Sequence, residues 1–417
     1  MGLATGWRRI VTAVVVAAVA AVTAVVAYRV LAPAEVSTAF RGDYPPAVTP
    51  DVGVVGRLPV APLIVDGRLR VYAAQRQVYA DGPADGRHRS TPYWSYRRWP
   101  AQVSGVVADG TRVISHWSDG KLVALDARTG RVAWRVDGPA PAEGWTARRT
   151  GAGAVWSPPG LFLARGSGGQ PVLIVSGPHR VAGFGLADGQ QLWSAEADGG
   201  CRTDVGTTSA GQFAVVDRCA GPAAVEFREV ATGALVTRWQ PPGVTAESTV
   251  TPVGCVTYRF QCRGLRVSGA ADDGGQGWLV GAKGPVPAPV LDPVGTELDG
   301  KWAVRAAGGA VTGWAARTGE ELWRRTDLGS VRMIAAQPGR VHLLTEANDL
   351  ITLDTSTGAE RSRFPLTVGS DGVGWAPGSA YAGGGYLAVE RLGEPVAPDA
   401  DDQRYFLTAE PVLLAAT

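Results

Sequence analysis

A short hairpin pattern that recurs along the chain constrains its fold more than any other feature. In the clearest copy, Leu122 and Ala124 and then Val132 and Trp134 show the two-residue period of a strand. A Thr-Gly pair ending at Gly130 separates the two runs and supplies the positive φ that a tight connection needs. Four further copies keep the glycine and an aromatic residue after it: Gly189 with Trp193, Gly233 with Trp239, Gly319 with Trp323, and Gly358 with Phe364.

The spacing of these copies predicts the architecture. From glycine to glycine the intervals are 59, 44, 86 and 39 residues, and the 86 is close to twice 43, so we expect a degenerate copy around Asp273-Gly274-Gly275, before Trp278. A repeat of about 40 to 45 residues with roughly four short strands is typical of a β-propeller blade. One blade cannot bury both of its faces, so the blades must form a ring.

The number of copies predicts an all-β propeller of seven or eight blades. Five clear copies and the degenerate sixth are joined by a first blade near residues 60–100 and a C-terminal pair of strands, Tyr386 to Leu392 and Tyr405 to Leu414. We favour eight blades. The last strand should then pair with N-terminal strands and close the ring.

The clearest copy also resembles a known family. Its motif is similar to the docking motif of pyrroloquinoline-quinone (PQQ) propellers and reads Ala124-x-Asp126-x-x-Thr129-Gly130-x-x-x-Trp134. The resemblance covers roughly residues 60 to 415 and implies that the tryptophan packs between neighbouring blades. The family includes many proteins that bind no quinone, so we expect a non-catalytic member, which the N-terminal segment described next makes a membrane-anchored one.

The N-terminal segment predicts transfer across a membrane. Eighteen residues from Ile10 to Ala27 carry no charge and follow Arg8 and Arg9, a length at the lower limit for a spanning helix. The alternative is a secretory signal peptide cleaved near Ala32-Pro33-Ala34. We favour the uncleaved anchor, with the N-terminus inside.

These features divide the chain into four parts. We expect a cytoplasmic N-terminus over residues 1–9, a transmembrane signal anchor over 10–30, a linker over 31–59 and the propeller over 60–417. The protein would be a single-pass cell-membrane protein with its propeller on the extracytoplasmic side.

Four cysteines predict disulfides. Cys201, Cys219, Cys255 and Cys262 would meet an oxidising compartment, and their spacing lacks the closely spaced pairs of structural zinc sites. Three connectivities are possible. The most local one joins Cys201 to Cys219 and Cys255 to Cys262.

The sequence offers little sign of catalysis. It has no GxSxG or HExxH motif, and its four histidines, His88, His116, His179 and His342, show no ligand spacing. Quinoprotein dehydrogenases of the family typically carry adjacent cysteines over the cofactor, and this chain has none. We therefore expect no catalytic residue, metal or cofactor, and the net charge of +2 argues against nucleic acid as a partner.

Two segments are candidates for a partner surface. The longest interval contains an insertion, roughly residues 138–169, with Trp145, Arg148, Arg149 and Trp156. The second is Tyr93 to Trp99, in which Trp94 and Trp99 alternate with basic residues; aromatic and arginine clusters are typical of interfaces. The alternatives are an idle loop extension and strand residues that cover blade 1.

Two functions fit these features. We favour a membrane-anchored extracytoplasmic scaffold that binds an envelope protein or ligand, and the alternative is a quinone-dependent dehydrogenase or another propeller enzyme. A likeness in fold alone does not decide between them.

Overall fold

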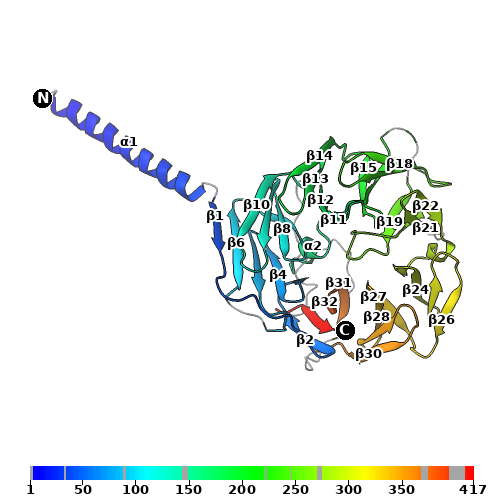
Figure 1. Ribbon diagram of the computed structural model, residues 1–417. Helices are drawn as coiled ribbons and strands as arrows, with labels where there is room; N and C mark the ends of the chain where they lie inside the picture. The colour runs from blue at the N-terminus through cyan, green and yellow to red at the C-terminus, as the bar shows by residue number, and fades with distance from the viewer. Residues whose placement is uncertain are drawn as a thin grey trace.

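The chain folds into a ring of antiparallel sheets. The computed structural model describes residues 3–31, 34–87, 91–142, 149–219, 221, 223–245, 247–269, 275–367, 374–393 and 409–417. Within these residues eight sheets stand around a common axis, and the helix α1 (Leu3–Leu31) extends away from the ring beside β1 (Figure 1). The fold is an all-β, eight-bladed propeller, so the prediction of eight blades is confirmed.

Blades 1 to 4 follow one another along the first half of the chain. Blade 1 consists of the N-terminal β1 (Ala34–Thr38) with β3 (Leu63–Val65), β4 (Leu69–Ala74), β5 (Gln77–Asp81) and β6 (Trp94–Trp99). Blade 2 consists of β7 (Val103–Asp109), β8 (Arg112–Trp117), β9 (Lys121–Asp126) and β10 (Val132–Asp137), and blade 3 of β11 (Leu161–Arg165), β12 (Pro171–Ser176), β13 (Arg180–Gly185) and β14 (Gln191–Glu196). Blade 4 consists of β15 (Arg202–Thr207), β16 (Gln212–Asp217), β17 (Ala224–Glu229) and β18 (Leu235–Trp239).

Blades 5 to 8 complete the ring. Blade 5 consists of β19 (Thr249–Val253), β20 (Gly264–Ser268), β21 (Gln276–Gly281) and β22 (Gly284–Pro287), and blade 6 of β23 (Thr296–Asp299), β24 (Trp302–Ala307), β25 (Ala310–Ala315) and β26 (Glu321–Arg325). Blade 7 consists of β27 (Val331–Gln337), β28 (Arg340–Thr345), β29 (Asp349–Asp354) and β30 (Glu360–Pro365). Blade 8 consists of β31 (Ala376–Gly383), β32 (Tyr386–Leu392), β33 (Val412–Ala416) and the N-terminal β2 (Gly53–Leu58). Two short helices, α2 (Ala152–Val155) and η1 (Pro289–Leu291), lie between strands.

The first strands of the blades surround the axis. Neighbouring first strands contact one another, as β7 does β11 and β11 does β15, so each blade begins at the centre and proceeds outward. Four antiparallel strands return the chain to the side from which it started. Every first strand therefore runs in the same direction along the channel.

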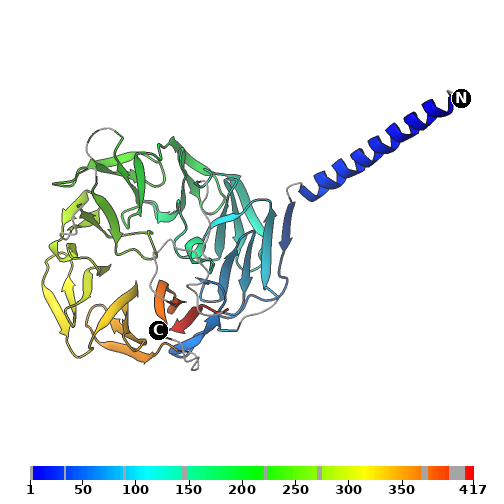
Figure 2. The same ribbon diagram turned by 180° about the vertical axis from the view of Figure 1, so that it is seen from behind.

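The N-terminal segment closes the ring instead of serving as a linker. β2 pairs with β33, with Leu58 opposite Val412 and Gly53 opposite Ala416, so an N-terminal strand and the C-terminal strand lie side by side in blade 8 (Figure 2). β1 pairs with β6 as a fifth strand of blade 1. The prediction of a linker over 31–59 is wrong for these strands, and residues 405–408 of the predicted closing strand lie outside the described residues.

One contact joins successive blades at four junctions. The Trp134 indole donates from Nε1 to the Leu186 carbonyl oxygen at 3.1 Å. A Cβ on Gly189 would lie 2.6 Å from the Trp134 ring, so only glycine fits under the indole. The same pair of contacts joins Trp94 to Ala127 and Gly130, Trp193 to Val230 and Gly233, and Trp323 to Thr355 and Gly358.

Trp94 therefore belongs to the packing between blades. Its side chain is fully buried, and its Nε1 donates to the Ala127 carbonyl oxygen at 2.7 Å. The placement of Trp94 on a partner surface is wrong, because β6 turns this side chain toward blade 2. Of the other repeat tryptophans, all on outermost strands, Trp134 is buried, whereas Trp193, Trp239 and Trp323 are half-buried.

Blade 5 departs from the repeat. The predicted degenerate copy falls between β20 and β21, the second and third strands, and not at the turn before the outermost strand; Asp273 and Gly274 themselves lie outside the described residues. Trp278 lies on β21 and meets the Trp239 ring of blade 4 edge-on, with centroids 4.9 Å apart. This pair of indoles takes the place of the tryptophan–glycine contact between blades 4 and 5.

The helix α1 covers the segment for which a transmembrane anchor is predicted. In the part of the chain that the structure describes, no helix is both long enough and apolar enough to cross a membrane.

A matched pair of glycines tests the contact between blades. Gly189 and Gly319 have φ of 74° and 73°, so alanine meets the same backbone strain at both. Only Gly189 lies under an indole; at Gly319 a Cβ would have no atom within 4 Å. We expect Gly189→Ala to lower the free energy of unfolding by about 1–3 kcal/mol more than Gly319→Ala, from overpacking. Urea and thermal denaturation measure the difference, and equal losses would contradict the proposed contact.

Candidate functional site in the central channel

The insertion between blades 2 and 3 enters the channel at the end where the first strands begin. Its helix α2 lies inside the ring (Figures 1 and 2). Trp156 stacks on Tyr381 of blade 8, with ring centroids 6.1 Å apart, and donates from Nε1 to the Pro62 carbonyl oxygen at 2.8 Å. Trp156 is buried, so the prediction of a surface loop is wrong for this half of the insertion.

Polar contacts fasten this insertion to the two blades that close the ring. The Thr150 hydroxyl donates to the Glu390 carboxylate of blade 8, and both side chains are buried. The Ser379 backbone N–H donates to the same carboxylate at 3.0 Å. On the blade 1 side, the Ala61 N–H donates to the Thr150 carbonyl oxygen at 2.7 Å. Because a buried carboxylate is costly without partners, these bonds fix the insertion in place.

A disulfide loop closes the other end of the channel. The Cys255–Cys262 loop follows the first strand β19 and so lies where the first strands finish. The Cys262 N–H donates to the Thr207 carbonyl oxygen at 2.7 Å, and the Thr207 N–H donates to that of Arg259 at 2.9 Å. Phe260 is buried against Phe162 of blade 3. The loop of blade 5 is thus held by blades 3 and 4.

A cavity of about 420 Å³ remains between the two segments. Its walls combine polar and apolar surface, and they come from the insertion, the disulfide loop and the first strands of blades 5 to 8: Trp156, Ser157, Pro252, Gly254, Cys255, Val256, Thr257, Tyr258, Glu297, Leu298, Ile334, Ala335, Ala336, Ser379, Ala380, Tyr381 and Ala382. The size suits a small ligand.

Glu297 is the one carboxylate among the described residues that line the cavity. Burial raises the pKa of Glu297, and the nearby Arg266 charge opposes this shift without cancelling it. The described walls provide no histidine or second carboxylate, and their other titratable side chains are Tyr258 and Tyr381. Burial raises the pKa of Tyr381 to about 12. The cavity can hold a small polar molecule.

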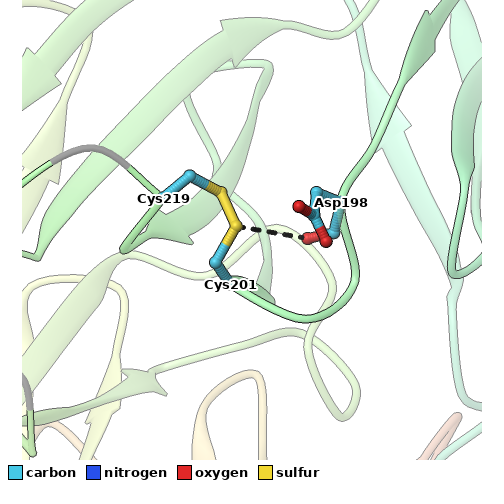
Figure 3. A group of neighbouring side chains, drawn as sticks. All are labelled: Asp198, Cys201 and Cys219. Carbon is cyan, nitrogen blue, oxygen red and sulfur yellow. Dashed lines mark hydrogen bonds between the residues drawn. A yellow bond between two sulfur atoms is a disulfide. The ribbon is translucent and has the colours of Figure 1, made fainter.

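The described residues contain one group of potential metal ligands. Asp198, Cys201 and Cys219 place one ligand atom each within 4.8 Å of one another. Figure 3 shows that the two sulfurs form a disulfide, with Asp198 in the adjoining turn. Metal binding by cysteine requires a thiolate, so the role of these residues is better explained as a disulfide cross-link than as a metal centre. Both disulfides have the predicted pairing.

A charged cluster beside this disulfide is structural. Arg238 contacts the carboxylates of Asp217 at 2.7 Å and Glu226 at 2.8 Å. Burial favours a higher pKa for Asp217, but hydrogen bonds from Arg238 and the Cys219 N–H outweigh it, and the pKa is lowered. The lowered pKa favours the ionised form of Asp217, which suits an ion pair with Arg238.

Two of the histidines are internal. Desolvation lowers the pKa of His116 to about 4 and that of His342 to about 3. His116 Nε2 lies 2.8 Å from the Pro139 carbonyl oxygen, and His342 contacts Gln337 and Thr352. His179 is exposed, and His88 lies outside the described residues.

The residues proposed for a partner surface do not form one group. Trp145 and Arg148 lie outside the described residues, Arg149 is exposed beside the buried Thr150, and Trp99 is exposed at the edge of blade 1. The residues that shape the channel, Glu297 and the Thr150–Glu390 pair, were not identified from sequence. Their partners are far apart along the chain, and no local motif marks them.

Comparisons with known proteins point to one family. The family model described as outer membrane protein assembly factor BamB matches residues 15–251 and 266–403. No curated protein matches the chain.

Several solved structures are similar over most of their length. BamB from Moraxella catarrhalis is 15% identical, with 92% of this chain and 96% of that chain covered and a TM-score of 0.41. The computationally designed Ika8 protein is 13% identical (90% and 100% covered, TM-score 0.46), and the C-terminal WD40 domain of Sif2 is 11% identical (89% and 99% covered, TM-score 0.49). The sheet order given above, and not these likenesses, defines the fold.

The two disulfides should contribute separately to stability. Non-reducing peptide mapping should recover Cys201–Cys219 and Cys255–Cys262 as the linked pairs. From the sequence separations of 18 and 7 residues, loop-closure entropy predicts that replacing both cysteines by serine costs about 3 kcal/mol for the first pair and about 2 kcal/mol for the second. Four free thiols in the protein isolated from its own membranes would contradict this prediction.

Glu297 should destabilise the folded protein as the pH rises. Because burial raises the pKa of Glu297, the folded protein binds the proton of this carboxyl group more tightly than the unfolded chain does. Protonated Glu297 therefore adds to the free energy of unfolding at low pH, and this contribution is lost as the pH rises through the raised pKa. Glu297→Gln should therefore increase the melting temperature at pH 8 and change it little at pH 4.

An exposed glutamate provides the control for this measurement. The Arg324 hydrogen bond lowers the pKa of Glu321, so Glu321→Gln should not raise the melting temperature at pH 8. An equal effect of the two substitutions at both pH values would show that burial of Glu297 is not the cause.

Proposed function

The chain belongs to the family described as outer membrane protein assembly factor BamB, and from this membership we propose that it is a protein-binding scaffold of the cell envelope. The observation that carries the proposal is the occlusion of the channel. An insertion from one end and a disulfide loop from the other narrow the channel with structural contacts and leave a cavity of about 420 Å³ between them. A protein partner is too large for this cavity and binds on the outside of the ring.

Membrane anchoring is part of this proposal. The uncharged run from Ile10 to Ala27 and the preceding Arg8 and Arg9 support a signal anchor with the N-terminus inside the cell. The disulfides support the same topology, because such bonds form and persist outside the cytoplasm.

The exposed part of the insertion is the proposed partner surface. Thr150 and Trp156 fix its C-terminal stem to blades 8 and 1, and Arg149 is exposed directly before that stem. Trp145 and Arg148 complete the surface in the proposal. A rigid stem lowers the entropic cost of binding through the residues that it carries.

Site-specific cross-linking tests this proposal. A photoreactive amino acid in place of Trp145, in the full chain in its own membranes, should give a discrete adduct with one envelope protein. The control position is Leu322, an exposed residue on β26 across the ring, where no such adduct should form. An additional Arg149→Glu change should weaken the adduct at position 145, since it reverses an exposed charge of the surface.

The dehydrogenase alternative has the opposite outcome. Calcium and pyrroloquinoline quinone would stabilise the folded protein, by about 2.7 kcal/mol at a hundredfold excess over the dissociation constant, and dye-linked oxidation of alcohols or sugars would follow. Saturable stabilisation with turnover, or adducts of equal yield at positions 145 and 322, would reject the scaffold.

A further inference from the structure

The edge of blade 1 carries an exposed face next to the end of α1. Ala34, the first residue of β1, pairs with Trp99, and Val36 pairs with Arg97. Residues opposite each other in an antiparallel pair lie on the same face of the sheet. Val36, Arg97 and Trp99 therefore share one face, and Arg76 joins them with its guanidinium 4.1 Å from the Trp99 ring centroid. We name these four residues the helix-exit face.

The composition of the helix-exit face is unusual for a sheet edge. Val36 is 57% exposed and Trp99 is 38% exposed, and Arg97 is exposed between them. Arg97 contacts the Gln77 side chain and Arg76 the Pro100 carbonyl oxygen. Among the described residues neither arginine has a carboxylate partner. The face thus combines apolar area with two positive charges that no acid neutralises.

The other face of the same strands is different. Trp94 and Tyr96 are buried toward blade 2, Arg98 forms a bidentate pair with Asp119, and Arg135 pairs with Glu35. Its charges are balanced and its aromatic residues are covered. The unbalanced charge and the exposed tryptophan lie on the side that faces away from blade 2.

The position of the helix-exit face limits its distance from the helix. α1 ends at Leu31 and β1 begins at Ala34, so three residues of chain span at most about 11 Å. Trp99 lies directly across from Ala34, about 5 Å further. The face is therefore tied within a short distance of the end of the helix.

We infer that the helix-exit face rests on the bilayer surface and binds anionic phospholipid headgroups. This inference rests on the proposed membrane anchor. Tryptophan favours the membrane–water interface and arginine is attracted to anionic headgroups, and Val36 adds apolar area between them. The contact holds the propeller edge-on, with blade 1 toward the membrane. The short distance from the end of α1 favours the bilayer over a protein partner at this face.

Fluorescence quenching in liposomes tests this inference with the full chain. Val36→Cys introduces a single free thiol on the face, and Ser37→Cys places one on the opposite face of the same strand. Each is labelled with an environment-sensitive dye under non-reducing conditions, in liposomes of phosphatidylglycerol and phosphatidylcholine that carry nitroxide headgroups. We expect at least threefold stronger quenching at position 36 than at position 37.

Further variants separate a specific contact from simple proximity to the anchor. With the label at position 36, Arg76→Gln with Arg97→Gln, or liposomes of phosphatidylcholine alone, should reduce quenching at least twofold. Equal quenching at positions 36 and 37, or no dependence on the arginines and the anionic lipid, would overturn the inference while leaving the anchor intact. A protein that fails to float with the liposomes would overturn both the anchor and the inference.

Discussion

The ring depends on the contact between a tryptophan of one blade and a glycine turn of the next. The indole covers apolar surface that a single blade cannot bury, and its N–H satisfies a backbone carbonyl three residues before the glycine, as Trp134 does at Leu186. Two constraints require glycine at position 189: its φ is positive, and the Trp134 indole lies against its Cα where a side chain would otherwise be. The same residue thus sets the shape of one blade and its distance from the previous one.

The unusual features of the chain lie at junctions where this contact is missing. Between blades 4 and 5, the Trp239–Trp278 pair and the Cys255–Cys262 loop join the two sheets. Between blades 8 and 1, the insertion supplies the bond from Thr150 to Glu390 and the contact of Trp156 with Pro62. The two segments that enter the channel therefore also join blades at two of the junctions that lack the tryptophan–glycine contact.

The parts of the fold that local interactions determine could be predicted from the sequence. A Thr-Gly or Asp-Gly turn between two alternating runs specifies a hairpin by itself, so the blades marked by Gly130, Gly189 and Gly358 could be predicted. Prediction from the sequence failed for β1 and β2, because each pairs with a strand far away in the sequence. Trp94 was misplaced for the same reason: its glycine lies 36 residues further on, in the next blade. The raised pKa of Glu297 depends on burial among four blades, which no local pattern reports.

An occluded channel has a consequence for how such a propeller meets its surroundings. With the channel narrowed to a small cavity, the two ends of the ring and its rim are the remaining surfaces for binding a protein, and the proposed anchor in α1 would determine which of them face the membrane. Attachment at the outermost strand of blade 1 is attachment at the rim. In the proposed arrangement the rim at blade 1 rests on the bilayer, and both ends of the ring stay open to the envelope. The end that carries the insertion, with its stem fixed by Thr150 and Trp156, then projects along the membrane plane, where a membrane-bound partner would meet it.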